Sequence, residues 1–249
     1  MNRDLARCAL AEALGTGLLV TIVVGSGIMA QRLSPGDTGL QLLENSTATA
    51  LGLAVLILIL GPVSGAHFNP VITLTDFALG RASRTGVDPV TVAVFLPAQV
   101  AGGIGGAVLA NLMFHLPAAT ASTRARTGAS LWLGEVVATA GLVLLVFALA
   151  RTGRGAYGPA AVGAYIGAAY WFTSSTSFAN PAVTIARAFT NTFAGIAPGS
   201  IGGFVAAQVL GAGIGAGLVV ILFPHRPTPA KPLASGETPA ASTIARTAA

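Results

Sequence analysis

Two Asn-Pro pairs, Asn69-Pro70 and Asn180-Pro181, are the polar features that stand out in an otherwise apolar chain. Asparagine at an N-cap followed by proline at the first helical position is a common helix start. One such pair alone predicts no more than an ordinary turn between helices. Each pair here lies in a short segment that is too interrupted to cross a bilayer. The two amide side chains would supply hydrogen-bond donors wherever the segments meet.

An internal repeat gives the two pairs equivalent positions. Phe95–Gly102 aligns with Phe204–Gly211 at a constant offset of 109 residues, with Phe, Gln, Val and Gly in register. Glu12 has a counterpart in Glu135 at an offset of 123, so loops of unequal length lie between the matched elements. Halves of three membrane spans each have opposite orientations, which makes this an inverted repeat. Such repeats place functional elements at their interface near the bilayer midplane.

The symmetry predicts what the two short segments do. Half-helices that enter from opposite faces bring their N-termini together, and each terminus carries about half a positive charge. Non-helical backbone at this depth is tolerated where it is buried or lines a wet cavity. Backbone carbonyls would act as acceptors there, and the amides of Asn69 and Asn180 as donors. This lining suits neutral hydrogen-bonding solutes and opposes cations, including protons.

Composition agrees with a membrane protein. Of 249 residues, 53% are hydrophobic and 8% are charged, against about a quarter charged in a soluble domain. The 32 glycines and the aromatic content of 6% are typical of helices that pack through small residues. The single Cys8 excludes an intrachain disulfide framework and a cysteine metal site. The net charge of +5 indicates membrane topology and not nucleic-acid binding.

Six stretches are long and apolar enough to span a bilayer: about 9–31, 43–62, 89–113, 130–150, 156–176 and 199–223. We expect a channel domain over 1–223, with repeat one at about 1–115 and repeat two at about 128–223. The first stretch reads as a retained helix and not a signal peptide. Residues 224–249 are rich in Pro, Ala, Ser and Thr, which predicts a disordered cytoplasmic tail.

The basic residues predict the orientation. With both termini in the cytoplasm, the inner side carries Arg3, Arg7, Arg81, Arg84, Arg151, Arg154, Arg226, Lys231 and Arg246, and the outer side carries Arg32, Arg124 and Arg126. This asymmetry follows the positive-inside rule.

The motifs resemble those of the aquaporin and aquaglyceroporin (major intrinsic protein) family over residues 5–223. The residues that carry the resemblance are Ser64–Pro70, Asn180–Ala182, Glu12, Glu135, Gln99 and Gln208. The resemblance implies an all-α membrane protein with six transmembrane helices and two re-entrant half-helices, in a right-handed aquaporin-like bundle. It also implies a homotetramer with one pore per protomer and no cofactor.

The resemblance assigns roles to particular residues. The pore centre would be formed by Asn69, Pro70, Val71, Asn180, Pro181 and Ala182, where Val71 replaces the usual Ala. Glu12 and Glu135 would support the re-entrant loops, and His67 would face the pore or satisfy the loop backbone.

Family spacing also places a selectivity filter. Its four positions would be Thr49, Ala168, Ser177 and Val183. Most family members carry Arg at the last position, so this filter should be wider and less cationic. Arg187 follows Val183 by one helical turn, and we expect it to serve packing or charge pairing. The aromatic run at 170–172 could narrow the pore, although such runs more often face lipid.

The preferred function is a passive channel for small neutral solutes in the inner (plasma) membrane of a bacterium. Its solutes would be water, glycerol-like polyols and arsenous acid, because the chain resembles the bacterial subgroup associated with arsenic resistance. We expect lipid as its surroundings, and no enzymatic activity, metal or nucleic-acid partner. The alternative is an ion- or proton-coupled secondary transporter, for which Asp76, Glu12 and Glu135 are the candidate titratable groups. A non-conducting scaffold fits the proposed polar lining least well.

Overall fold

The computed structural model describes residues 3–81 and 85–224, and these contain helices and no strand. The helices are α1 (Arg3–Leu33), α2 (Thr38–Ser64), α3 (Pro70–Gly80), α4 (Pro89–Met113), α5 (Ala129–Arg151), α6 (Gly158–Phe172), α7 (Pro181–Ala186) and α8 (Ile201–Leu222). Single 3₁₀ turns lie at Gly155–Tyr157, Arg187–Phe189 and Pro198–Ser200. The predicted tail from His225 onward, and Arg84, lie outside the described residues.

The helices agree with five of the six predicted spans. Helices α1, α2, α4 and α5, and Pro198–Leu222, are long and apolar enough to cross a membrane. The sixth prediction, 156–176, is too long, because α6 has 15 residues and ends at Phe172. Thr173 leaves the helix with an extended backbone while its hydroxyl bonds to the carbonyl of Ala169. Hydroxyl side chains often compete in this way with helix continuation.

Close helix pairs form each half of the bundle. Helix α1 packs against α4 and α2, and α5 packs against α8 and α6, while α2 and α6 join the halves. At the first crossing, a methyl group on Gly106 would lie 2.0 Å from the carbonyl oxygen of Gly17. At the crossing of α5 and α8, a methyl group on Gly215 would lie 2.5 Å from the carbonyl oxygen of Ala140. Glycine is therefore required for these backbones to approach so closely.

Polarity is distributed as expected for a lipid-facing surface. Glu12 and Glu135 are completely buried, whereas Leu51, Val90 and Ile221 are exposed on the outside of the described chain. Burial of unpaired carboxylates costs several kcal/mol, so both acids need partners inside the bundle.

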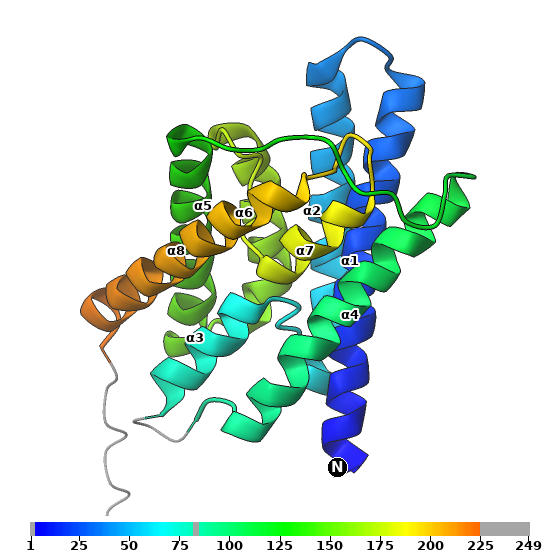
Figure 1. Ribbon diagram of the computed structural model, residues 1–249. Coiled ribbons are helices and arrows are strands. Elements are labelled where there is room, and N and C mark those ends of the chain that lie inside the picture. The colour runs from blue at the N-terminus through cyan, green and yellow to red at the C-terminus, as the bar shows by residue number, and fades with distance from the viewer. Residues whose placement is uncertain (1–2, 82–84, 225–249) are drawn as a thin grey trace, which may run out of the picture.

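The two short helices, α3 and α7, begin near the middle of the bundle and run away from each other (Figure 1). Asparagine caps both: the Oδ1 of Asn69 accepts from the amide of Val71 at 3.1 Å, and that of Asn180 accepts from Ala182 at 2.9 Å. Proline follows each cap at the first helical position. The sequence chemistry of the Asn-Pro pairs thus sets where both half-helices begin.

Candidate functional site

The two asparagine side chains bind across to the opposite half of the chain. The Nδ2 of Asn69 donates to the carbonyl of Ala179 at 2.8 Å, and the Nδ2 of Asn180 donates to the carbonyl of Phe68 at 2.7 Å. A primary amide has two N–H bonds, so each asparagine keeps one donor for another partner. Both residues line the same cavity. The half-helix N-termini therefore meet around two free amide donors.

The loops that lead to the asparagines share an unusual backbone. Ala66 and Phe68 have φ of 49°, and in the second half Ser177 has φ of 49° and Ala179 has φ of 48°. Left-handed backbone in residues other than glycine costs roughly 1–3 kcal/mol per residue. It persists where surrounding contacts hold it in place.

Glu12 supplies these contacts in the first half. Its carboxylate accepts from the Ser64 hydroxyl at 2.7 Å and from the backbone amides of His67 at 3.0 Å and Phe68 at 2.7 Å. The side chain of Gln99 donates to it as well, at 2.7 Å. Four charge-assisted donors thus satisfy an acid that is fully buried.

Glu135 occupies the equivalent place in the second half. It accepts from the amides of Phe178 and Ala179, each at 2.8 Å, and from Gln208 at 2.6 Å. Both acids are therefore engaged with the loops, and neither lines the cavity.

A threonine in each half completes the network, and the sequence analysis missed it. Gln99 donates to the hydroxyl of Thr73 at 3.0 Å, and Thr73 donates to the carbonyl of Asn69 at 3.2 Å. Gln208 and Thr184 repeat these contacts at 2.9 Å and 2.8 Å, with the carbonyl of Asn180 as acceptor. The signal was present, because a threonine follows each asparagine by four residues.

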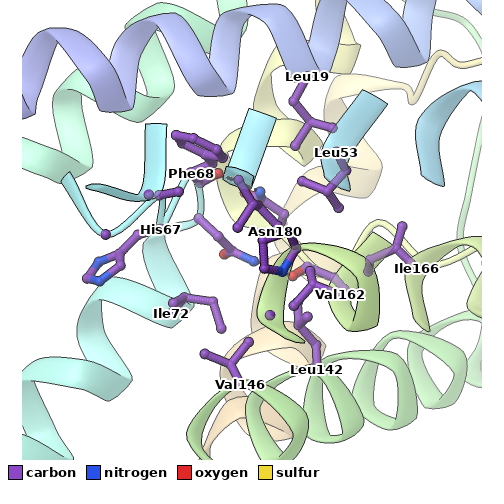
Figure 2. Close-up of a pocket in the computed structure, with 18 of the residues that line it drawn as sticks. Leu19, Leu53, His67, Phe68, Ile72, Leu142, Val146, Val162, Ile166 and Asn180 are labelled. Atoms are coloured by element: carbon purple, nitrogen blue, oxygen red, sulfur yellow. Dashed lines mark hydrogen bonds between the residues drawn. The ribbon is translucent and has the colours of Figure 1, made fainter. Parts of the chain in front are cut away.

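A cavity of about 640 Å³ runs beside the two asparagines. In Figure 2, Leu19 and Leu53 lie above Asn180, and Leu142 and Val146 lie below it. The polar groups gather along the loops, and the remaining wall is mostly apolar. An apolar wall offers few hydrogen bonds to water or a solute, so the polar contacts of a solute would be concentrated near the asparagines.

Three of the four predicted filter positions lie on this cavity. Thr49, Ser177 and Val183 are buried and line it. The hydroxyl of Thr49 lies 3.2 Å from that of Tyr170, at hydrogen-bonding distance. Residues from α2, α6, α7 and the second loop are thereby brought together.

The prediction for Ala168 is wrong. Ala168 is exposed and does not line the cavity, whereas Val162, Ile166 and Tyr170 do. These three recur every four residues and share one face of α6, which excludes position 168 from that face. Family spacing fails here because counting back 12 residues from Asn180 passes through the irregular loop after α6.

Tyr170 also separates from the other two residues of the aromatic run. It is buried on the cavity, whereas Trp171 and Phe172 are exposed on the outside. The two readings of the run thus divide: Tyr170 lies on the cavity, and Trp171 and Phe172 lie on the outer surface.

His67 and Asp76 also line the cavity. The Nδ1 of His67 lies 3.1 Å from the hydroxyl of Thr73, and its ring meets the edge of Phe95. Asp76 accepts from the amide of Val87 at 2.8 Å. The histidine therefore contacts both the loop network and the cavity.

Arg187 lies directly after α7 and is only 2% exposed. Its Nε donates to the carbonyl of Ala194, and its Cζ lies 3.4 Å from the ring centroid of Phe178. No carboxylate lies within ion-pair distance of it in the described chain. The packing role agrees with the sequence analysis, but Arg187 also lines the cavity, which that analysis did not predict.

The connection between α4 and α5 covers this end of α7. Ser122 donates its amide to the carbonyl of Ala188 at 3.0 Å, and the side chain of Arg126 donates to the carbonyl of Gly195 at 2.9 Å. The guanidinium of Arg126 lies 5.1 Å from the ring of Phe178, the ring that also contacts Arg187. Burial lowers the pKa of Arg126 to about 10, so it stays charged at neutral pH.

Comparison with known proteins identifies the arrangement. The profile of the major intrinsic protein family matches residues 2–177 of the chain. The chain belongs to this family. It is 55% identical over 209 residues to the aquaglyceroporin AqpS of Rhizobium meliloti (strain 1021), covering 84% of this chain and 87% of that protein. It is 32% identical over 179 residues to the propanediol uptake facilitator PduF of Citrobacter freundii, covering 62% and 63%.

A solved structure confirms the fold. The aquaglyceroporin from Plasmodium falciparum matches with a TM-score of 0.64 at 20% identity, covering 86% of this chain and 95% of that one. The prediction of an aquaporin-like helical bundle is therefore confirmed. As a member of the major intrinsic protein family, the protein is a membrane channel and not an enzyme.

Proposed function

We propose that the channel passively conducts small neutral solutes that carry hydroxyl groups, including glycerol-like polyols and arsenous acid, together with water. The observation that carries this proposal is the pair Asn69 and Asn180, which line a cavity of about 640 Å³ and each keep one free amide donor. A neutral hydroxyl can accept from these donors without bringing a charge into a low-dielectric interior. The names of the relatives, an aquaglyceroporin and a propanediol uptake facilitator, support a polyol pathway.

The filter of this channel consists of Thr49, Ser177 and Val183, with Tyr170 from α6 in place of the residue expected there. Val183 is uncharged, whereas family resemblance places an arginine at this position. Compared with arginine, a valine lacks up to five N–H donors and leaves room for a solute broader than water. Arsenous acid fits this chemistry because it is compact, neutral and carries three hydroxyls.

Coupled transport is the weaker alternative. It requires titratable groups near the solute that change their protonation during each cycle. Glu12 and Glu135 are instead occupied by loop amides and lie off the cavity. Asp76 lines the cavity and accepts from Val87, so it remains the single described acid to test.

The proposal extends to assembly and orientation. The apolar outer surface, with Leu51, Val90 and Ile221 exposed, suits contact with lipid or with other protomers of a homotetramer. The excess of arginines on one side of the sequence-predicted spans supports cytoplasmic termini in a bacterial inner membrane. Repeat one at about 1–115 and repeat two at about 128–223 would then form one channel domain.

Reconstitution tests the function directly. Purified protein in liposomes should admit glycerol and arsenous acid faster than empty liposomes of the same lipid, measured by stopped-flow light scattering and by arsenic content after filtration. Rates equal to those of empty lipid for both solutes would refute the proposal. Glycerol uptake without arsenous acid uptake would restrict it to polyols.

A further inference from the structure

Val183 carries no charge, but a positively charged residue follows it by one helical turn. Arg187 is four residues beyond Val183, and its backbone amide bonds to the carbonyl of Val183, so the helical register continues between them. Both side chains line the same cavity. Arg187 is the one lysine or arginine that does so among residues 3–81 and 85–224.

Two contacts hold the guanidinium of Arg187 in place. Its Cζ lies over the ring of Phe178, 3.4 Å from the centroid, and its Nε donates to the carbonyl of Ala194. Stacking of this kind fixes an arginine through its plane and leaves the edge nitrogens free. Phe178 is itself anchored, since its backbone amide donates to Glu135.

The terminal nitrogens of Arg187 are available to the cavity. They have no hydrogen-bond partner anywhere in the described chain, and they are not among its fully buried unsatisfied atoms. Because Arg187 lines the cavity, its unit of charge and its unbonded N–H donors lie next to the cavity contents. A fixed charge in a low-dielectric lumen raises the energy of any approaching cation.

We propose that Arg187 is the cation-excluding residue of this filter, displaced by one helical turn from the position where the family carries arginine. The inference rests on the proposed channel function and specifies its selectivity. Val183 then leaves the filter wide, and Arg187 supplies its positive charge and hydrogen-bond donors. A neutral polyol can accept hydrogen bonds from the guanidinium, whereas a cation is repelled.

The test compares two arginines on one aromatic ring. Arg187→Gln removes the charge that lines the cavity, and Arg126→Gln removes the charge 5.1 Å from the same Phe178 but off the cavity. Proteoliposomes of each variant would be assayed for glycerol by light scattering and for potassium and methylammonium by ion electrode and tracer uptake. We expect Arg187→Gln to raise cation permeability by about tenfold, and Arg126→Gln to match the wild type.

Equal cation permeability in the wild type and Arg187→Gln, with glycerol uptake intact, would overturn this inference alone. Absence of both glycerol and arsenous acid uptake in the wild type would instead refute the channel function. If the Gln variant does not fold, Arg187→Lys keeps the charge without the planar stack and must exclude cations. A folded Lys variant that leaks cations would also overturn the inference.

Charge rescue separates charge from shape. In a Cys8→Ser background, Arg187→Cys would be modified from the lumen with methanethiosulfonate ethylammonium, or with the neutral hydroxyethyl analogue. We expect the cationic reagent to restore cation exclusion and the neutral reagent to leave the leak. Equal effects of both reagents would show that bulk, and not charge, excludes cations.

Discussion

Val183 contributes an apolar side chain to the cavity wall and no polar group beyond its backbone. Its amide donates to the Oδ1 of Asn180 at 3.2 Å, so the residue is fixed to the cap of α7 while its side chain lines the cavity. A longer, charged side chain at this place would project into the lumen. The position is therefore a direct test of what sets the width of the pore.

We expect Val183→Arg to reduce glycerol and arsenous acid permeability by about tenfold or more, while water permeability stays within about twofold of the wild type. The added guanidinium narrows the lumen for bulky solutes but still leaves room for water. Stopped-flow measurements on proteoliposomes of equal protein content give both rates. Ala168→Leu is the control, because Ala168 is exposed and off the cavity. Unchanged solute rates in Val183→Arg would mean that the constriction lies elsewhere.

Residues of the candidate site differ in how well the neighbouring sequence predicts their positions. Asn69 and Asn180 were predictable because capping chemistry is local. Tyr170 was not, because which face of α6 meets the cavity depends on the path of the following loop. The cavity-lining position of Arg187 depends on Phe178 and on the carbonyl of Ala194, contacts that no local pattern predicts.

Helix α1 meets α4 at a close backbone contact, and side-chain hydrogen bonds flank it. Gly106 packs on the carbonyl of Gly17, and the hydroxyl of Thr21 donates to the carbonyl of Gly106 at 3.1 Å. The contact brings Glu12 on α1 and Gln99 on α4 within 2.7 Å of each other. Close packing of this pair therefore positions the first loop.

Adding a methyl group should separate these helices. Gly106→Ala places a carbon 2.0 Å from an oxygen of α1, so we expect a loss of about 1–3 kcal/mol in the free energy of unfolding. Gly105→Ala is the matched control on the neighbouring residue, because a methyl group there meets nothing within 4 Å. Thermal unfolding in detergent, followed by circular dichroism, compares the two. Equal stability of both variants would contradict close packing at this crossing.

Elements were easier to predict than their ends. The predicted span 89–113 coincides with α4, because Asp88 caps it and Pro89 begins it. The prediction for α6 ran four residues too far, because Thr173, Ser174, Ser175 and Thr176 do not interrupt an apolar pattern as a charge would. The Thr173 hydroxyl bonds to the carbonyl of Ala169, and the Ser175 hydroxyl bonds to that of Thr173, where the chain leaves the helix. The Ser174 hydroxyl bonds to the carbonyl of Ser130 on α5.

The molecule as a whole is two similar halves joined at the centre. Each half has an acid, a glutamine and a threonine that hold one left-handed loop. Glu12 and Glu135 each accept several hydrogen bonds that hold the loops, so neither carboxylate is available to a solute. This arrangement favours a rigid pathway over one driven by protons.

We therefore expect glycerol uptake to follow the glycerol gradient and to be unaffected by an imposed pH difference. Proteoliposomes with pH 6 inside and pH 8 outside, and the reverse, should give the same initial rate and the same final glycerol level. The control variant is Asp76→Asn, which alters the described acid on the cavity. Accumulation of glycerol above its external concentration in the wild type would indicate coupling and contradict a passive channel.

The crossed amide bonds have a consequence for biosynthesis. Asn69 binds the carbonyl of Ala179, and Asn180 follows Asn69 by 111 residues. A nascent chain that leaves the ribosome in order thus inserts its first re-entrant loop long before the partner of that loop is translated. The first half therefore lacks the acceptor for the Asn69 amide until the second re-entrant loop has been made, so the centre of the molecule forms only after both halves are in place.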